Sequence, residues 1–127
     1  MGRDSLMRSL FQGVNEAIDP HNLTDLEKRH IPTIEAPSPI RAGEPFCATV
    51  RVGAALPHPN ERGHFIEFIE FYADDLFLAR VSLTAVSTKP EVSLSVCLSA
   101  PAGRLRALAR CNMHGTWVGT APISMAE

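Results

Sequence analysis

The sequence predicts an all-β fold, an immunoglobulin-like antiparallel β-sandwich of about seven strands with a short N-terminal helix. Two observations predict it. From residue 45 onward, apolar and polar residues alternate with the period of two that a half-buried strand shows. Turns containing proline or glycine separate these alternating segments at short intervals. A length of 127 residues suits one domain with one core, and we expect the sandwich to occupy residues 24–127.

The N-terminal segment has a different period. Its apolar residues recur every three or four positions and form one stripe, made of Leu6, Met7, Leu10, Phe11, Val14, Ala17 and Ile18. Pro20 ends the stripe. We therefore expect residues 1–23 to be a helical extension that docks on the body of the domain or on a neighbouring subunit.

A short helical turn should begin after this extension. The stretch Thr24-Asp25-Leu26-Glu27 has the capping-box pattern, in which the first and fourth residues satisfy each other's backbone N–H groups. Pro32 disfavours helix at Ile31. His30 should therefore lie where a helical turn meets extended chain.

The strands follow from the alternation. The clearest alternating segments are residues 46–52, 81–85, 92–98 and 105–109, whereas 64–72 is apolar on both faces and 116–124 is a candidate last strand. The same alternation separates the three cysteines. Cys47 and Cys97 fall on polar faces, and Cys111 continues the apolar face of its strand at the point where that strand ends.

Composition excludes several classes of protein. A net charge of −2 argues against a general nucleic-acid binder. No apolar run approaches the roughly 20 residues that cross a bilayer, and the first residues lack the pattern of a signal peptide, so we expect no membrane partner. Three cysteines cannot all pair within one chain, which favours a reducing cytoplasm.

Five residues are candidate metal ligands: His30, His58, His64, Cys111 and His114. They include every histidine of the chain except His21. His58 lies between two prolines that stiffen its loop, and Cys111 and His114 are three residues apart, before a glycine that frees the backbone direction. One sulfur and several imidazole nitrogens form a donor set for a transition metal.

The number of donors bears on which metal binds. Structural zinc sites are nearly always four-coordinate, whereas five donors suit a square-pyramidal iron centre with one open position for a small molecule. A thiolate pushes electron density onto iron, as in thiolate-ligated haem. Two alternatives stay open from the residues alone, namely a zinc-stabilised structural domain and a non-catalytic metal-binding or sulfur-carrier-like sandwich module.

Six short segments form a recognisable pattern: 27–32 (EKRHIP), 42–46 (AGEPF), 57–60 (PHPN), 64–66 (HFI), 69–72 (IEFY) and 111–117 (CNMHGTW). In this order and spacing they resemble the motifs of a known family, the superoxide reductases of the neelaredoxin and desulfoferrodoxin type. The resemblance covers roughly residues 24–124. Larger members carry an additional four-cysteine iron domain, and this chain resembles the one-iron form that lacks it.

The resemblance implies a fold, a cofactor and a reaction. One Fe(2+)/Fe(3+) ion per chain would be held by His30, His58, His64 and His114 in a plane, with Cys111 axial. Ferrous iron would reduce superoxide to hydrogen peroxide without forming dioxygen. An external donor such as a rubredoxin-like protein would supply the electron, and the chain is expected to form a homo-oligomer, a dimer or tetramer.

One segment departs from the family pattern. Members usually carry glutamate two residues and lysine one residue before the first histidine, but this chain has Lys28 and Arg29 there, with Glu27 one position earlier. Arg29 can supply the positive charge that attracts superoxide, although a guanidinium is a poor proton donor and Lys28 could assist. Glu27 is either a capping residue or the family's sixth ligand.

Overall fold

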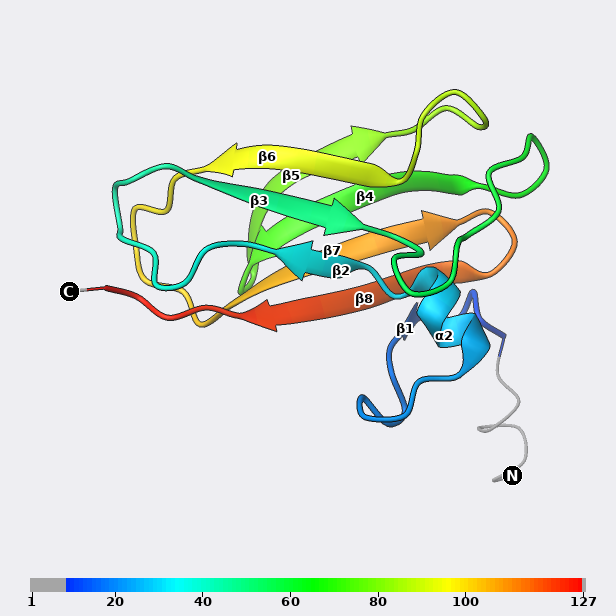
Figure 1. Cartoon of the computed structure of the whole chain (residues 1–127), viewed down its shortest axis with the longest axis horizontal. Helices are drawn as coiled ribbons and strands as arrows, with labels where there is room; N and C mark the ends of the chain where they lie inside the picture. Colours follow the sequence, from blue (N-terminus) through cyan, green and yellow to red (C-terminus); the bar gives the residue numbers. More distant parts are fainter. Residues whose placement is uncertain (1–8, 127) are drawn as a thin grey trace.

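The computed structural model describes residues 9–126. Its elements are β1 (Val14–Asn15), α2 (Asp25–His30), β2 (Thr33–Glu35), β3 (Phe46–Arg51), β4 (Ile66–Ala73), β5 (Leu76–Ser82), β6 (Glu91–Val96), β7 (Arg104–Cys111) and β8 (Gly115–Pro122). The strands form two sheets, ordered β1-β8-β7-β4-β5 and β2-β3-β6. The two sheets face each other, and α2 lies at one end of the sandwich (Figure 1). The predicted all-β, immunoglobulin-like sandwich is confirmed.

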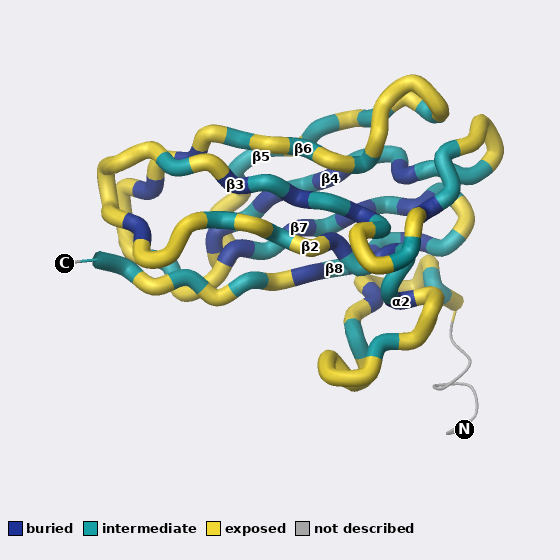
Figure 2. The backbone as a smooth tube through the Cα atoms, viewed as in Figure 1, coloured by how far each residue is buried: buried dark blue, intermediate teal, exposed yellow. Residues whose placement is uncertain are grey.

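The strand alternation places one face of each sheet in the core. Ala48 and Val50 of β3 are fully buried, as are Ala107 and Ala109 of β7, while the residues between them are more exposed (Figure 2). Cys111 continues the buried face of β7 and has no exposed surface. Complete burial stabilises the fold by about 1.5–3 kcal/mol for a side chain such as Val50, and by less for each alanine. This core fixes the strand end that carries the sulfur.

Cys47 and Cys97 are exposed, as the alternation predicts, and neither forms a disulfide. All pairings between the named strands are antiparallel except one. The exception is β1, which pairs parallel to β8 with Val14 opposite Thr116.

The helix predicted for residues 1–23 is wrong over its described part, residues 9–23, and its earlier residues lie outside the described range. The chain instead makes a turn and then β1. The side-chain amide of Asn15 donates to the carbonyl oxygens of Leu10 and Thr116, at 2.8 and 2.9 Å. Pairing with β8 replaces the hydrogen bonds of a helix whose isolated stability would be marginal, and it docks the segment on the body of the domain.

The strand predicted over 81–85 begins earlier. β5 runs from Leu76 to Ser82 and forms a tight hairpin with β4 around Asp74 and Asp75. Asp74 has a φ of 49°, a left-handed conformation that aspartate tolerates better than most residues. Its carboxylate also accepts hydrogen bonds from the backbone N–H groups of Gly103 and Arg104. These contacts clamp the end of the sandwich opposite α2.

The capping box that begins α2 is present as predicted. The Thr24 hydroxyl accepts a hydrogen bond from the Glu27 N–H at 3.1 Å, and the Glu27 carboxylate accepts one from the Thr24 N–H at 2.8 Å. The helix has six residues and ends at His30, where the chain becomes extended before Pro32. Over residues 9–126, no helix is long and apolar enough to cross a membrane.

Candidate metal centre

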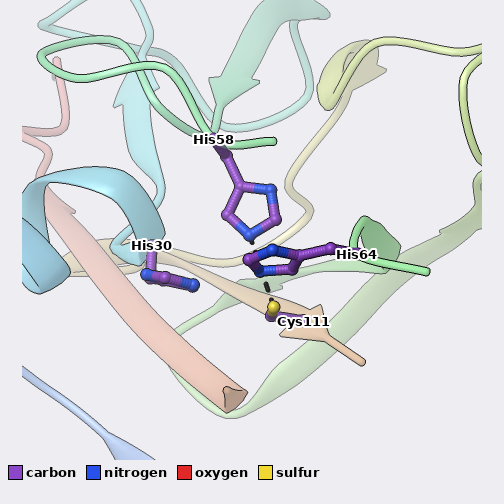
Figure 3. A group of neighbouring side chains, drawn as sticks. All are labelled: His30, His58, His64 and Cys111. Atoms are coloured by element: carbon purple, nitrogen blue, oxygen red, sulfur yellow. Dashed lines mark hydrogen bonds between the residues drawn. The ribbon is translucent and has the colours of Figure 1, made fainter. Parts of the chain in front are cut away.

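Four donor side chains meet at the end of the sandwich where α2 lies. His30 is the last residue of α2, His58 and His64 lie on the connection between β3 and β4, and Cys111 ends β7. One ligand atom from each lies within 4.8 Å of every other (Figure 3). Segments far apart in the sequence therefore converge on one point.

His114 borders this group. Its Nδ1 atom lies 3.7 Å from the Cys111 sulfur. The four imidazoles form a closed cycle, in which the ring centres are 4.7 Å apart from His30 to His58, 4.8 Å from His58 to His64, 5.0 Å from His64 to His114 and 4.9 Å from His114 to His30. The sides of the cycle are nearly equal, and the sulfur lies beside two of its members, His58 and His114.

The spacing of the rings fits one shared metal ion. A ligand nitrogen about 2.1 Å from a metal places its ring centre roughly 3.2 Å from that metal, so four rings at the corners of a square would have neighbouring centres about 4.5 Å apart. The observed spacings of 4.7 to 5.0 Å are slightly wider. The ring spacing therefore fits four imidazoles around one ion, and the ligand atoms of His30, His58 and His64 already lie within 4.8 Å of one another.

Hydrogen bonds orient two of the imidazoles. The Nδ1 atom of His30 lies 2.7 Å from the Leu26 carbonyl oxygen, and the Nδ1 atom of His58 lies 2.6 Å from that of Pro59. A carbonyl oxygen only accepts, so Nδ1 carries the proton in both rings and the Nε2 lone pair is free to bind a metal. This is the arrangement that metal-binding histidines usually have.

Two buried nitrogens point to an ion at the centre of the cycle. The Nε2 atoms of His30 and His64 are buried and have no hydrogen-bond partner among the described residues. Buried polar atoms are nearly always satisfied, because an unmade hydrogen bond costs about 1–3 kcal/mol. A metal ion bound to both nitrogens would remove this cost.

Three of the imidazoles, those of His30, His58 and His114, are held in the neutral form. Burial lowers the pKa of His58 from 6.5 to about 4, and it also lowers those of His30 and His114. The positive charge that neighbouring imidazoles would carry lowers all three further. Neutral imidazole is the form that binds metals, so these sites are ready for a cation at neutral pH.

The sulfur is a buried thiol that a cation would activate. Burial raises the pKa of Cys111, whereas hydrogen bonds from the backbone of Met113 and His114 oppose that increase. A bound metal ion would overcome the effect of burial and favour the thiolate, because a thiol that coordinates a metal is deprotonated outright. The pocket of four imidazoles and one thiol is therefore suited to a soft or borderline cation.

Two glycines allow the backbone to bring the ligands together. Gly53 and Gly115 both have a φ of 83°, which is costly for other residues. A Cβ atom on Gly53 would lie 2.6 Å from the backbone nitrogen of His58, and one on Gly115 would collide with the Leu10 carbonyl. The predicted role of Gly115 in turning the chain after His114 is confirmed.

The three residues before His30, which are Glu27, Lys28 and Arg29, have different environments. Both carboxylate oxygens of Glu27 accept backbone hydrogen bonds, one from Thr24 at 2.8 Å and one from Ile18 at 3.1 Å. The Arg29 guanidinium donates to the Pro57 carbonyl at 2.9 Å, next to His58. Lys28 is half-buried on the same helix. The arginine thus lies against the histidine loop, and the glutamate is used as a cap.

The sequence motifs contain further site residues that were not assigned a role. Trp117 is buried, stacks on the His30 ring with centres 5.1 Å apart, and donates to the His114 carbonyl at 2.9 Å. Asn60 bonds to the backbone of Val86 and Thr88, and Asn112 bonds to the backbone on both sides of His64. Each of the three lies within three residues of a ligand and inside a segment that matches the family motifs, and these were the available sequence signals.

The fold and the site together define a class: an immunoglobulin-like sandwich with one histidine–cysteine centre for a transition metal at its end. Within that class, the chain belongs to the desulfoferrodoxin family, whose model matches residues 22–120.

Individual relatives agree with this assignment. A protein of Methanocaldococcus jannaschii is 46% identical over 99 residues, a match that covers 74% of this chain and 81% of the relative. The superoxide reductase of Pyrococcus furiosus is 34% identical over 108 residues, covering 71% and 84%. The solved superoxide reductase (neelaredoxin) of Ignicoccus hospitalis superposes with a TM-score of 0.75 at 31% identity, covering 89% of this chain and 95% of that one.

Proposed function

We propose that the protein is a superoxide reductase that uses one iron ion per chain. The observation that carries the proposal is the closed cycle of four imidazoles with a buried thiol beside it. This cluster lies in a chain that belongs to the desulfoferrodoxin family. Bound ferrous iron would supply the single electron that, with two protons, converts superoxide to hydrogen peroxide.

The five donors would have separate tasks. His30, His58, His64 and His114 would surround the ion, and Cys111 would bind it from one side as a thiolate. The Nδ1 hydrogen bonds of His30 and His58 hold these rings with Nε2 inward. His30 and Cys111 are 1% and 0% exposed, so the protein would shield these two donors from water.

Arg29 is the residue proposed to attract the anion. Its guanidinium is fixed on the Pro57 carbonyl, so the positive charge lies between α2 and the His58 loop. A fixed charge near a site raises the capture rate of an anion. Because a guanidinium does not release its proton, Lys28 or water would supply protons. The capping role of Glu27 is supported over a ligand role, since both of its oxygens already accept backbone N–H groups.

The cellular setting is part of the same proposal. The reaction consumes one electron for each superoxide, and we propose an external rubredoxin-like donor, a homo-oligomeric assembly and a cytoplasmic location. The exposed, unpaired thiols of Cys47 and Cys97 agree with a reducing compartment.

The experiment is to load the protein with ferrous iron without oxygen and expose it to superoxide by pulse radiolysis. We expect rapid oxidation of the iron centre, with one hydrogen peroxide and no dioxygen formed for each superoxide consumed. Dioxygen in the products would indicate a dismutase instead. Iron that binds tightly but does not react would indicate a carrier module, and a zinc content that excludes iron would indicate a structural domain.

A further inference from the structure

Asn112 holds the chain on both sides of His64. Its Oδ1 atom accepts a hydrogen bond from the Phe65 N–H at 2.9 Å, and its Nδ2 atom donates to the Gly63 carbonyl at 3.0 Å. Its own backbone N–H donates to the Phe65 carbonyl at 3.2 Å. The Asn112 side chain therefore forms hydrogen bonds with the backbone of the residue before His64 and of the residue after it.

These bonds continue a sheet beyond its last paired residues. The pairing of β4 with β7 ends where Ile66 lies opposite Cys111. Asn112 is the next residue along, and its side-chain amide offers one donor and one acceptor, as a backbone peptide does. Beyond the last β4–β7 pair, the Asn112 amide makes hydrogen bonds of the kind that a backbone peptide group would make. These bonds connect the segment around His64 to the end of β7, which carries the sulfur.

His64 depends on the hydrogen bonds of Asn112 for its position. His30 and His58 have ring hydrogen bonds of their own. The rings of His30 and His58 are oriented by Nδ1 bonds to carbonyl oxygens. Among residues 9–126, the His64 ring has no such bond, and its Nε2 atom is buried without a partner. Backbone bonds between Glu61 and His64 close the turn, but they do not connect it to Cys111.

We propose that Asn112 is a positioning residue that sets His64 at the distance from Cys111 at which both bind the same metal ion. The inference rests on the proposed metal centre. Asn112 does not touch the ion, and it acts through the backbone of residues 63 and 65. The proposal requires both halves of the amide, because a carboxylate could accept from Phe65 but would repel the Gly63 carbonyl.

The test compares Asn112→Asp and Asn112→Ala with the unchanged chain, using Co²⁺ alone as the probe. Binding is followed by the thiolate-to-cobalt charge-transfer absorption, and folding of the metal-free protein by circular dichroism. A matched control is Asp74→Ala, which removes a side chain that also bonds two backbone N–H groups, those of Gly103 and Arg104, at the other end of β7. Loss of a residue that supports a ligand typically weakens metal binding about 10- to 100-fold.

We expect both Asn112 variants to bind Co²⁺ about 10- to 100-fold more weakly, with a shifted absorption band, while Asp74→Ala lowers the melting temperature and leaves both the affinity and the band unchanged. Equal affinity and an unchanged band in Asn112→Asp would overturn the proposal. So would a metal-free Asn112→Asp protein that does not fold while Asp74→Ala does, because that would indicate a purely structural role. If the unchanged chain gave no thiolate band, the metal centre itself would be refuted.

Discussion

The Nε2 atom of His58 lies 3.3 Å from the sulfur of Cys111, although 53 residues separate them in the chain. The contact joins the loop in which His58 lies between two prolines to the buried end of β7. Neither residue could reach the other if the β3–β4 connection did not fold back over the end of the sandwich. The same convergence brings in His30 from α2 and His64 from the end of the β3–β4 connection.

The first prediction concerns the sulfur. Cys111→Ser should abolish the thiolate-to-iron absorption of the oxidised protein. It should also reduce turnover by more than about 100-fold, since loss of a residue that only supports a ligand already costs about 10- to 100-fold. A hydroxyl stays protonated and is a poor ligand for this donor set. The measurement is the visible spectrum with the rate after a superoxide pulse. Cys97→Ser, at an exposed thiol, is the control and should change neither; an unchanged spectrum in Cys111→Ser would refute the ligand assignment.

The second prediction concerns Arg29. Arg29→Ala should slow the capture of superoxide several-fold at low ionic strength and much less at high ionic strength, because salt screens charges that lie more than about 10 Å apart at 0.1 M. The measurement is the bimolecular rate at several salt concentrations. Arg29→Lys keeps the charge and should retain most of the rate. A loss in Arg29→Ala that is the same at every salt concentration would show that the bond to Pro57 matters and the charge does not.

The sequence predicts the sandwich because alternation reports directly which face of a strand is buried, and β3, β6 and β7 lie where it indicates. It fails at β1. A stripe at three- and four-residue spacing is typical of a helix, but the bonds that Asn15 makes to Leu10 and Thr116 determine the conformation, and no local pattern contains Thr116. The three-residue strand β2 is too short to show alternation.

The candidate ligands could be found from sequence, because their chemistry and local spacing are both unusual. The backbone partners of the residues that position these ligands could not be found from sequence. Arg29 bonds Pro57, Asn60 bonds Val86, and Asn112 bonds Gly63, and each partner is at least 26 residues away. Such pairs depend on how the loops cross at the end of the sandwich. That crossing is a property of the topology and leaves no periodic signal.

The third prediction concerns the pH dependence that Glu27 contributes. Hydrogen bonds from Thr24 and Ile18 lower the pKa of this carboxyl in the folded protein. Its contribution to stability is therefore complete above the unfolded-state pKa of about 4.3 and is lost as pH falls through the lower folded value. Glu27→Gln should cost about 1–2 kcal/mol at pH 7, and the difference from the unchanged chain should shrink in acid.

Urea unfolding of the metal-free proteins at pH 7, 5 and 3.5 checks this difference. The oxidised, iron-loaded Glu27→Gln protein should keep its absorption spectrum, because the carboxylate serves as a helix cap. A shifted charge-transfer band in that variant would instead support the role of sixth ligand.

The fourth prediction concerns removal of the metal. His58 titrates near 6.5 when unfolded and at about 4 when folded, so the unfolded state binds more protons between these values. The metal-free protein should therefore lose stability as pH falls from 6.5 to 4, by on the order of 3 kcal/mol from this group. Urea unfolding across that range measures the slope, and His58→Gln should reduce it. An equal slope in the variant would show that other groups carry the pH dependence.

The central claim is that one iron ion is bound by one sulfur and four imidazole nitrogens. X-ray absorption at the iron edge, on reduced protein whose iron content is known, measures that set most directly. The account predicts about one iron per chain with a shell of four nitrogens and one sulfur, and loss of the sulfur in Cys111→Ser. An iron shell without sulfur in the unchanged chain, or protein that binds only zinc in a four-coordinate site, would contradict it.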